Sequence, residues 1–291
     1  MATLRGWDLL RSILAREPFE TPAVAFWKHH PVADQDARSL AEATLAFQRR
    51  VDCDFVKLTP ASSYQLVDYG LRDQWIPDGI GRRTVTHRPV TVPDDWLRIT
   101  ARRPGAGFTG EILRAAALVR RALPREIPLV ATIFNPVFQA VALAGERVFG
   151  AHRQTAADRV DQGLATLTRN TVALIGALRD AGVDGFYLAS QHAGMPCSGD
   201  AACAAAMRGS LSIMHLHGEG VNLDAVPRGI DVLHYDCTLP GNPSVNAAMR
   251  RFRGIVASVE PPAPILAGGC AIPLAVPELE LAARVERYRR S

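Results

Sequence analysis

Leu211-Ser-Ile-Met-His-Leu-His-Gly-Glu-Gly220 begins as an apolar strand and ends in a loop that two glycines bracket. Residues two apart in a strand point to the same face, so His215 and His217 are expected to leave the strand side by side. Two neighbouring imidazoles can bind a metal ion. The alternative is that one histidine packs in a core and the other is solvated at the end of the strand.

Seven further short apolar runs can form strands, and helical segments separate most of them. The runs are 23–28, 53–58, 128–135, 183–189, 230–235, 254–258 and 264–267. No glycine-rich nucleotide-binding sequence follows the first run. Eight strands alternating with helices predict a single (β/α)8 barrel, a TIM barrel of the α/β class, formed by residues 1–291. In such a barrel, the chemistry is expected on the loops that follow the C-terminal ends of the strands.

Residues 60–108 interrupt this alternation with a long stretch that has no regular helical or strand period. The stretch contains Tyr64, Tyr69, Trp75 and Trp96 together with several prolines and glycines. Long loops inside compact domains are usually functional. We therefore expect a lid-like insertion after strand two that covers the mouth of the barrel, the alternative being a decorative insertion.

Composition limits the class of protein. The 33 basic and 29 acidic residues give a net charge of +4, and no basic run is interleaved with aromatics, so nucleic acid is not expected as a partner. No apolar run reaches the length of a membrane span, so a membrane is not expected either. An odd number of cysteines, five, in a core-rich chain predicts no disulfide framework and a reduced cytoplasmic location.

A catalytic zinc site needs a third protein ligand beside the two histidines. Cys270 is the best candidate, because it ends the eighth strand after two glycines that allow a tight turn. Cys237, at the end of the sixth strand, is a rival third ligand. The alternative for Cys270 is an inert, buried thiol.

Four other residues are candidates for catalytic roles. Glu219 follows the two histidines and is a candidate fourth ligand or general acid-base, or it caps the next helix. His192 and Tyr187, near the end of the fourth strand, are candidates for substrate contact. Lys57 lies in the second strand, and a buried lysine there would imply a carboxylate partner or a charged substrate.

Several motifs, in their order along the chain, resemble the uroporphyrinogen decarboxylase superfamily. They are Phe26-Trp-Lys-His-His-Pro31, Asp54-Phe-Val-Lys-Leu-Thr-Pro60, Ala181-Gly-Val-Asp-Gly185, His215-Leu-His-Gly218 and Gly268-Gly-Cys-Ala-Ile-Pro273. The resemblance runs from about residue 20 to the end and implies a (β/α)8 barrel. It also implies one of two chemistries, which are metal-free decarboxylation of a porphyrinogen and zinc-dependent methyl transfer between a corrinoid and a thiol or related acceptor.

The methyltransferase branch matches better. Decarboxylases carry an arginine-rich N-terminal segment, whereas residues 26–31 contain no arginine. In the methyltransferase branch, a His-x-Cys pair follows strand five and a cysteine follows strand eight, positions that His215 and Cys270 match. His217 stands where cysteine is usual, which makes the site less rich in thiolate and leaves the identity of the acceptor open.

We therefore expect a zinc-dependent methyltransferase-type enzyme that acts on a small substrate at the C-terminal mouth of the barrel. His215, His217 and Cys270 would bind Zn²⁺, and a corrinoid or a corrinoid protein would supply the methyl group. The alternative is a metal-free decarboxylase-like enzyme acting on a tetrapyrrole or another carboxylated ring. A third hypothesis is a non-catalytic barrel that binds a corrinoid or a protein partner.

Overall fold

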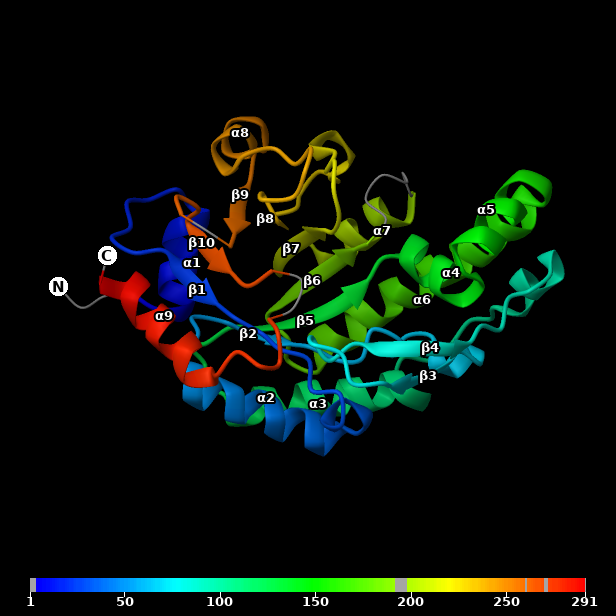
Figure 1. Cartoon of the computed structure of the whole chain (residues 1–291), viewed down its shortest axis with the longest axis horizontal. Coiled ribbons are helices and arrows are strands. Elements are labelled where there is room, and N and C mark those ends of the chain that lie inside the picture. Colours follow the sequence, from blue (N-terminus) through cyan, green and yellow to red (C-terminus); the bar gives the residue numbers. More distant parts are fainter. Residues whose placement is uncertain (1–3, 192–197, 260, 270–271, 291) are drawn as a thin grey trace.

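The structure, a computed structural model, describes residues 4–191, 198–259, 261–269 and 272–290. Eight parallel strands form one nearly closed sheet in the order β1-β10-β9-β8-β7-β6-β5-β2 (Figure 1). The strands are β1 Ala23–Ala25, β2 Val56–Leu58, β5 Leu129–Phe134, β6 Gly185–Ser190, β7 Leu211–Leu216, β8 Val232–Tyr235, β9 Ile255–Ser258 and β10 Ile265–Ala267. Each overlaps one of the eight predicted runs, so the predicted (β/α)8 barrel is confirmed.

The backbone and the side chain of Asp54, just before β2, both form hydrogen bonds to β1 at the other edge of this sheet. Asp54 N donates to Val24 O at 2.8 Å, and Val24 N donates back to Asp54 Oδ2 at 2.8 Å. The other oxygen of this buried carboxylate, Oδ1, lies 3.5 Å from Arg5 and 3.3 Å from Arg289. Asp54 therefore connects β1 with the segment before β2, a contact that we call the barrel seam, and it also binds arginines near both ends of the chain.

The described helices mostly cover the outside of the barrel, and α5 extends away from it (Figure 1). They are α1 Gly6–Leu14, α2 Ala37–Val51, α3 Gly107–Ala122, α4 Pro136–Ala144, α5 Glu146–Thr155, α6 Ala157–Asp180, α7 Ser198–Met207, α8 Val245–Arg251 and α9 Glu278–Arg290. Asp36 caps α2 by accepting a hydrogen bond from Ser39 N. None of the described helices is both long and apolar enough to cross a membrane.

The insertion is more regular than predicted. It contains an antiparallel hairpin of β3 (Arg72–Trp75) and β4 (Arg83–His87), and two 3-10 helices, Val67–Tyr69 and Pro93–Arg98. The prediction of an irregular stretch was wrong, because the hairpin strands are largely polar and lack the apolar alternation that reveals a strand. Helices α4 and α5 were not predicted either.

The insertion and helices α4 to α6 share a hydrophobic core of their own. We define the side lobe as residues 66–99, α4, α5 and the N-terminal part of α6, and it extends to the right in Figure 1. Trp96 lies fully buried in this core, and its Nε1 donates to His152 Nδ1 at 3.1 Å. The core comprises Leu66, Leu71, Val90, Trp96, Ile99, Val137, Ala140, Val141, Leu143, Ala144, Phe149, Val160 and Leu167.

Candidate functional site

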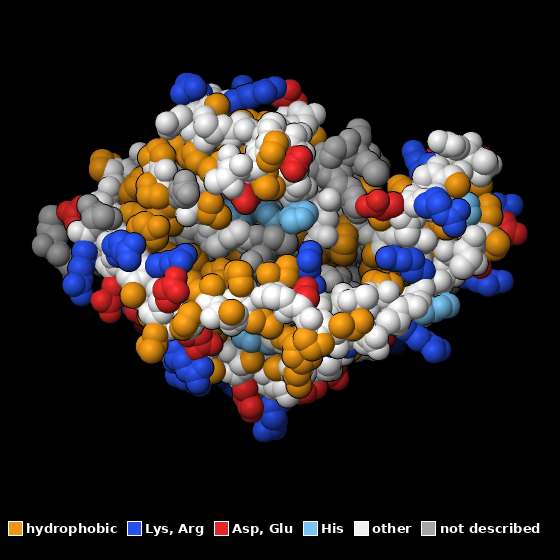
Figure 2. Space-filling model, in the orientation of Figure 1, with side chains coloured by type: hydrophobic (Ala, Val, Ile, Leu, Met, Phe, Trp, Pro, Cys, Tyr) orange, Lys and Arg blue, Asp and Glu red, His pale blue; other side chains and the backbone are white. Residues whose placement is uncertain are grey.

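A cavity of about 670 Å³ lies at the C-terminal ends of the barrel strands. Figure 2 shows this region as a central hollow that contains histidine side chains and is bordered by Lys or Arg side chains. The barrel side is lined by His29, Lys57, Thr59, Pro60, Ser62, Thr132, Phe134, Tyr187, Ala189, Gln191, His215 and His217. The lobe side is lined by Asp78, Arg82, Arg83, Thr84, Val85, Arg88, Phe138, Val141, Ala142, Gly145 and Glu146.

The structure brings His215 and His217 together on one wall of the cavity. His215 lies within β7, and His217 follows the strand with its N–H donated to Ser190 O at 3.0 Å. Their ring centroids are 5.8 Å apart. Burial lowers the pKa of His215 well below its usual value, and the charges of His234, His217 and Lys57 lower it further. His215 is therefore neutral at physiological pH, which is the form that binds metals.

The third ligand remains a prediction, because Cys270 lies outside the described residues, as does His192. Within residues 4–191, 198–259, 261–269 and 272–290, no three His, Cys, Asp or Glu side chains are grouped so as to hold a metal ion. The rival ligand Cys237 is directed elsewhere, since its Sγ lies 3.2 Å from Ser258 Oγ and it is not among the described residues that line the cavity.

Glu219 lies away from the described lining of the cavity. Its side chain is exposed, two residues beyond His217. It also caps no described helix, because the 3-10 helix Leu223–Ala225 is capped by Asn222, which accepts a hydrogen bond from Asp224 N.

Lys57 and Tyr187 form the floor of the cavity. Both side chains are buried, and Lys57 Nζ lies 4.5 Å from the centre of the Tyr187 ring and 4.8 Å from that of Trp27. Thr59 Oγ1 lies 3.4 Å from the same ammonium group. Contacts with aromatic faces stabilise a cation that is partly removed from water. Lys57 is therefore buried, which is the case in which the sequence predicts a carboxylate partner or a charged substrate.

His234 is a member of this cluster that the sequence analysis missed. Its Nδ1 lies 2.7 Å from Tyr187 Oη, and its ring stacks on His215 with centroids 4.8 Å apart. Burial, and then the charge of Lys57, lowers the pKa of His234 to about 3. Its Nε2 is buried and has no hydrogen-bond partner among the described residues. The signal that could have identified His234 is its place near the end of the sixth strand, three residues before Cys237.

Arg83, in the hairpin of the side lobe, contacts the segment that follows β1 of the barrel. Arg83 Nε lies 2.6 Å from Asp73 Oδ1, and Arg83 Nη1 donates to Pro31 O at 3.0 Å. The same Nη1 lies 3.8 Å from the buried carboxylate of Asp34. Residue 31 and Asp34 follow β1, so this contact fixes the lobe wall relative to the barrel wall.

Residues 24–196, more than half of the chain, match the sequence profile of the family Uroporphyrinogen decarboxylase (URO-D). The chain belongs to the uroporphyrinogen decarboxylase family. No curated protein matches the sequence. The family membership agrees with the resemblance that the motifs indicated.

Solved structures support the fold of this uroporphyrinogen decarboxylase family member. A methyltransferase from Methanosarcina mazei is 18% identical, with 97% of each chain covered and a TM-score of 0.82. A B12-independent methionine synthase from Shewanella sp. W3-18-1, in complex with selenomethionine, is 10% identical with a TM-score of 0.51. That match covers 86% of this chain and 88% of the other. At these identities, the similarity establishes the shared fold.

Proposed function

We propose that this protein is a zinc-dependent methyltransferase-type enzyme that acts on a small substrate in the cavity at the mouth of the barrel. The observation that carries the proposal is the pair formed by His215 and His217, which share one wall of the cavity. The methyltransferase fold of the Methanosarcina mazei protein, similar over nearly the whole chain, supports the same branch of the family.

The described residues fit zinc in their donor chemistry. A neutral imidazole is a good zinc ligand, and the pKa of His215 lies well below its usual value. In this proposal His215, His217 and Cys270 hold the ion, which leaves one position open for substrate. Bound zinc would supply a Lewis acid that lowers the pKa of a substrate thiol or hydroxyl group.

The remaining residues of the cavity would orient the substrate. Tyr187 presents its ring to the cavity while its hydroxyl group is held by His234 at 2.7 Å. Lys57 places a positive charge at the floor, and its cation–π contacts keep that charge in position. A corrinoid, free or carried by a protein partner, would enter from the open side of the cavity as methyl donor.

The decarboxylase alternative has less support in the cavity. A tetrapyrrole with several carboxylates would need several cations without internal partners. Arg82 is paired with Asp78 at 3.5 Å, and Arg83 is paired with Asp73 at 2.6 Å. Two of the three arginines that line the cavity are thus already neutralised.

Zinc content per chain, measured by elemental analysis, tests the proposal. We expect about one zinc per chain in the wild type, and a large loss in Cys270→Ser and His217→Ala. Cys237→Ser is the matched control and should keep its zinc, because Cys237 bonds to Ser258. If Cys270→Ser retains zinc and Cys237→Ser loses it, the third zinc ligand is Cys237 and not Cys270.

Turnover is then measured as methyl transfer from methylcobalamin to small thiols. Loss of zinc and of turnover in the same variants is the expected result. A metal-free protein that releases carbon dioxide from a carboxylated ring would support the decarboxylase alternative. A zinc-loaded protein without turnover would favour the non-catalytic barrel.

A further inference from the structure

Arg88 differs from the other two arginines of the cavity in its partners. Arg82 and Arg83 are paired with carboxylates, whereas no carboxylate of a described residue lies within ion-pairing distance of Arg88. A guanidinium group stays protonated in proteins, so the charge of Arg88 is permanent. A half-buried, permanent charge beside a cavity is stabilised when an anion enters it.

Two backbone carbonyls hold the Arg88 guanidinium in place. Nη1 donates to Ala142 O, and to Val141 O at 3.4 Å, near the C-terminal end of α4. The stem of the side chain passes over Gly145, where an added side-chain carbon would lie 3.4 Å from Arg88 Cδ. The favourable position of a cation at a helix C-terminus explains this contact, but it occupies only Nη1. Nε and Nη2 have no acceptor among the described residues, so their donors are left for a ligand.

An apolar shelf continues from this anchor toward the barrel. Val141 and Ala142, whose carbonyls hold Arg88, also line the cavity. Phe134 and Phe138 lie beyond them, with ring centroids 4.8 Å apart. A flat or branched apolar group would find van der Waals contacts on these side chains without leaving a polar atom unpaired.

This shelf, formed by Phe134, Phe138, Val141 and Ala142, lies near the strand whose C-terminal end carries the two histidines. In the sheet, Phe134 is the ladder partner of Ala189, and Ala189 is the partner of His215. Adjacent strands lie about 4.8 Å apart, so the backbones at Phe134 and His215 are separated by roughly 10 Å. A molecule of small size can therefore lie on the shelf with its far end beside His215 and His217.

We propose that the substrate is a small organic anion with an apolar body. Arg88 binds its carboxylate or sulfonate, the shelf of Phe134 and Phe138 holds its body, and the reacting heteroatom at the opposite end faces His215 and His217. This inference rests on the proposed function for the identity of the reacting end. The anion site and the shelf themselves require neither zinc nor a methyl donor.

Binding of two isosteric probes to the full-length protein tests this assignment. The probes are 4-methylbenzoate and the uncharged 4-methylbenzamide, measured by isothermal titration calorimetry. We expect the wild type to prefer the anion by about 10- to 100-fold, the usual value of a charge-assisted, bidentate contact. Acetate, which has no apolar body, should bind more weakly than 4-methylbenzoate because it leaves the shelf uncovered.

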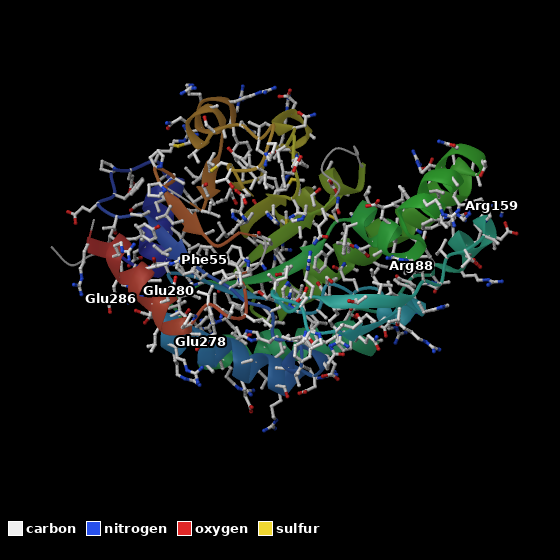
Figure 3. The ribbon with its side chains drawn as sticks, in the orientation of Figure 1. Phe55, Arg88, Arg159, Glu278, Glu280 and Glu286 are labelled. Carbon is white, nitrogen blue, oxygen red and sulfur yellow. The ribbon has the colours of Figure 1, made fainter. Side chains whose placement is uncertain are left out.

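Arg88→Gln should remove the preference for the anion and leave the affinity for the amide nearly unchanged. Arg88→Lys keeps the charge but lacks the planar fork, so it should show an intermediate preference. The matched control is Arg159→Gln, because Arg159 belongs to the same lobe but lies at its outer end, where it pairs with Asp94 at 3.1 Å (Figure 3). Phe138→Ala should weaken the binding of both probes by a similar factor.

Thermal melting of each variant shows whether it is folded, and Arg88→Lys serves as the test if Arg88→Gln does not fold. A wild type that binds the amide as tightly as the anion, or binds neither, overturns the proposal. If Arg88→Gln still prefers the anion over the amide, the proposal is also overturned, and another cation of the cavity must bind the anion. Failure of the proposed function has a different signature, which is normal probe selectivity in a protein without zinc or methyl transfer.

Discussion

The hydrogen bond between Tyr187 and His234 offers a quantitative test of the cavity floor. Both side chains are buried, and the two atoms lie 2.7 Å apart. Tyr187→Phe removes the hydroxyl group and leaves His234 Nδ1 without this partner. A buried polar atom that loses its partner costs about 1 to 3 kcal/mol, so we expect that decrease in the free energy of unfolding.

His234→Leu has a smaller expected effect. It leaves the Tyr187 hydroxyl without this partner, but it also removes Nε2, a buried atom with no partner among the described residues. In the double variant both polar groups are absent, so the double variant should lose about 1 to 2 kcal/mol less than the sum of the single variants.

Urea unfolding followed by circular dichroism and tryptophan fluorescence supplies the three values. Tyr64→Phe is the control, because its hydroxyl group is equally buried but donates to Thr132 O at 2.9 Å. Tyr64→Phe and His234→Leu should be additive within about 0.5 kcal/mol. Additivity of Tyr187→Phe with His234→Leu would refute the proposed coupling, and with it the view that His234 fixes the tyrosine at the floor of the cavity.

Three further predictions concern the seam, the lobe and the pH dependence. Asp54→Ala leaves the buried Val24 N–H without its acceptor and should lower the free energy of unfolding by about 2 to 3 kcal/mol. The control Asp52→Asn, at an exposed position, should lower it by less than about 1 kcal/mol. Equal losses for the two variants in urea unfolding would contradict this prediction. Trp96→Ala should lower the free energy of local unfolding of the lobe by about 3 to 5 kcal/mol. Amide hydrogen exchange should therefore become faster in α5 while the barrel strands stay protected. A uniform increase in exchange across the chain would contradict a separate lobe core. Burial and the Lys57 charge lower the pKa of His29 to about 4, below its unfolded value, so the free energy of unfolding should fall by up to about 3 kcal/mol as the pH drops from 6.5 toward 4. His29→Gln should flatten that slope, and an unchanged slope would show that His29 does not contribute to it.

The sequence predicted the barrel because its strands are buried on both faces. Runs such as Leu129–Phe134 and Gly185–Ser190 are short, apolar and separated by helices, and this pattern has few other solutions. The period-2 rule also placed His215 and His217 on one wall correctly. The two strands of the hairpin were missed because polar residues dominate both of their faces.

The rest of the site depends on contacts between distant segments. His234 and Tyr187 are 47 residues apart, and no local pattern indicates that their side chains meet at 2.7 Å. Arg88 lies in a polar stretch that resembles any solvated loop, and its place at the cavity depends on Val141 and Ala142, which lie in α4. The position of Cys270 lies outside the described residues and remains a prediction.

The separate core of the side lobe gives the two walls of the cavity different freedom to change. Substitutions on the histidine wall disturb strands on which the whole barrel depends, whereas Arg88, Val85 and Phe138 project from a lobe packed around Trp96. Exchange of residues 66–99 together with α4 and α5 would therefore replace one wall of the cavity and retain the reacting groups. Natural variation or directed evolution could thus alter which molecule is accepted by reshaping this lobe, with the barrel strands inherited unchanged.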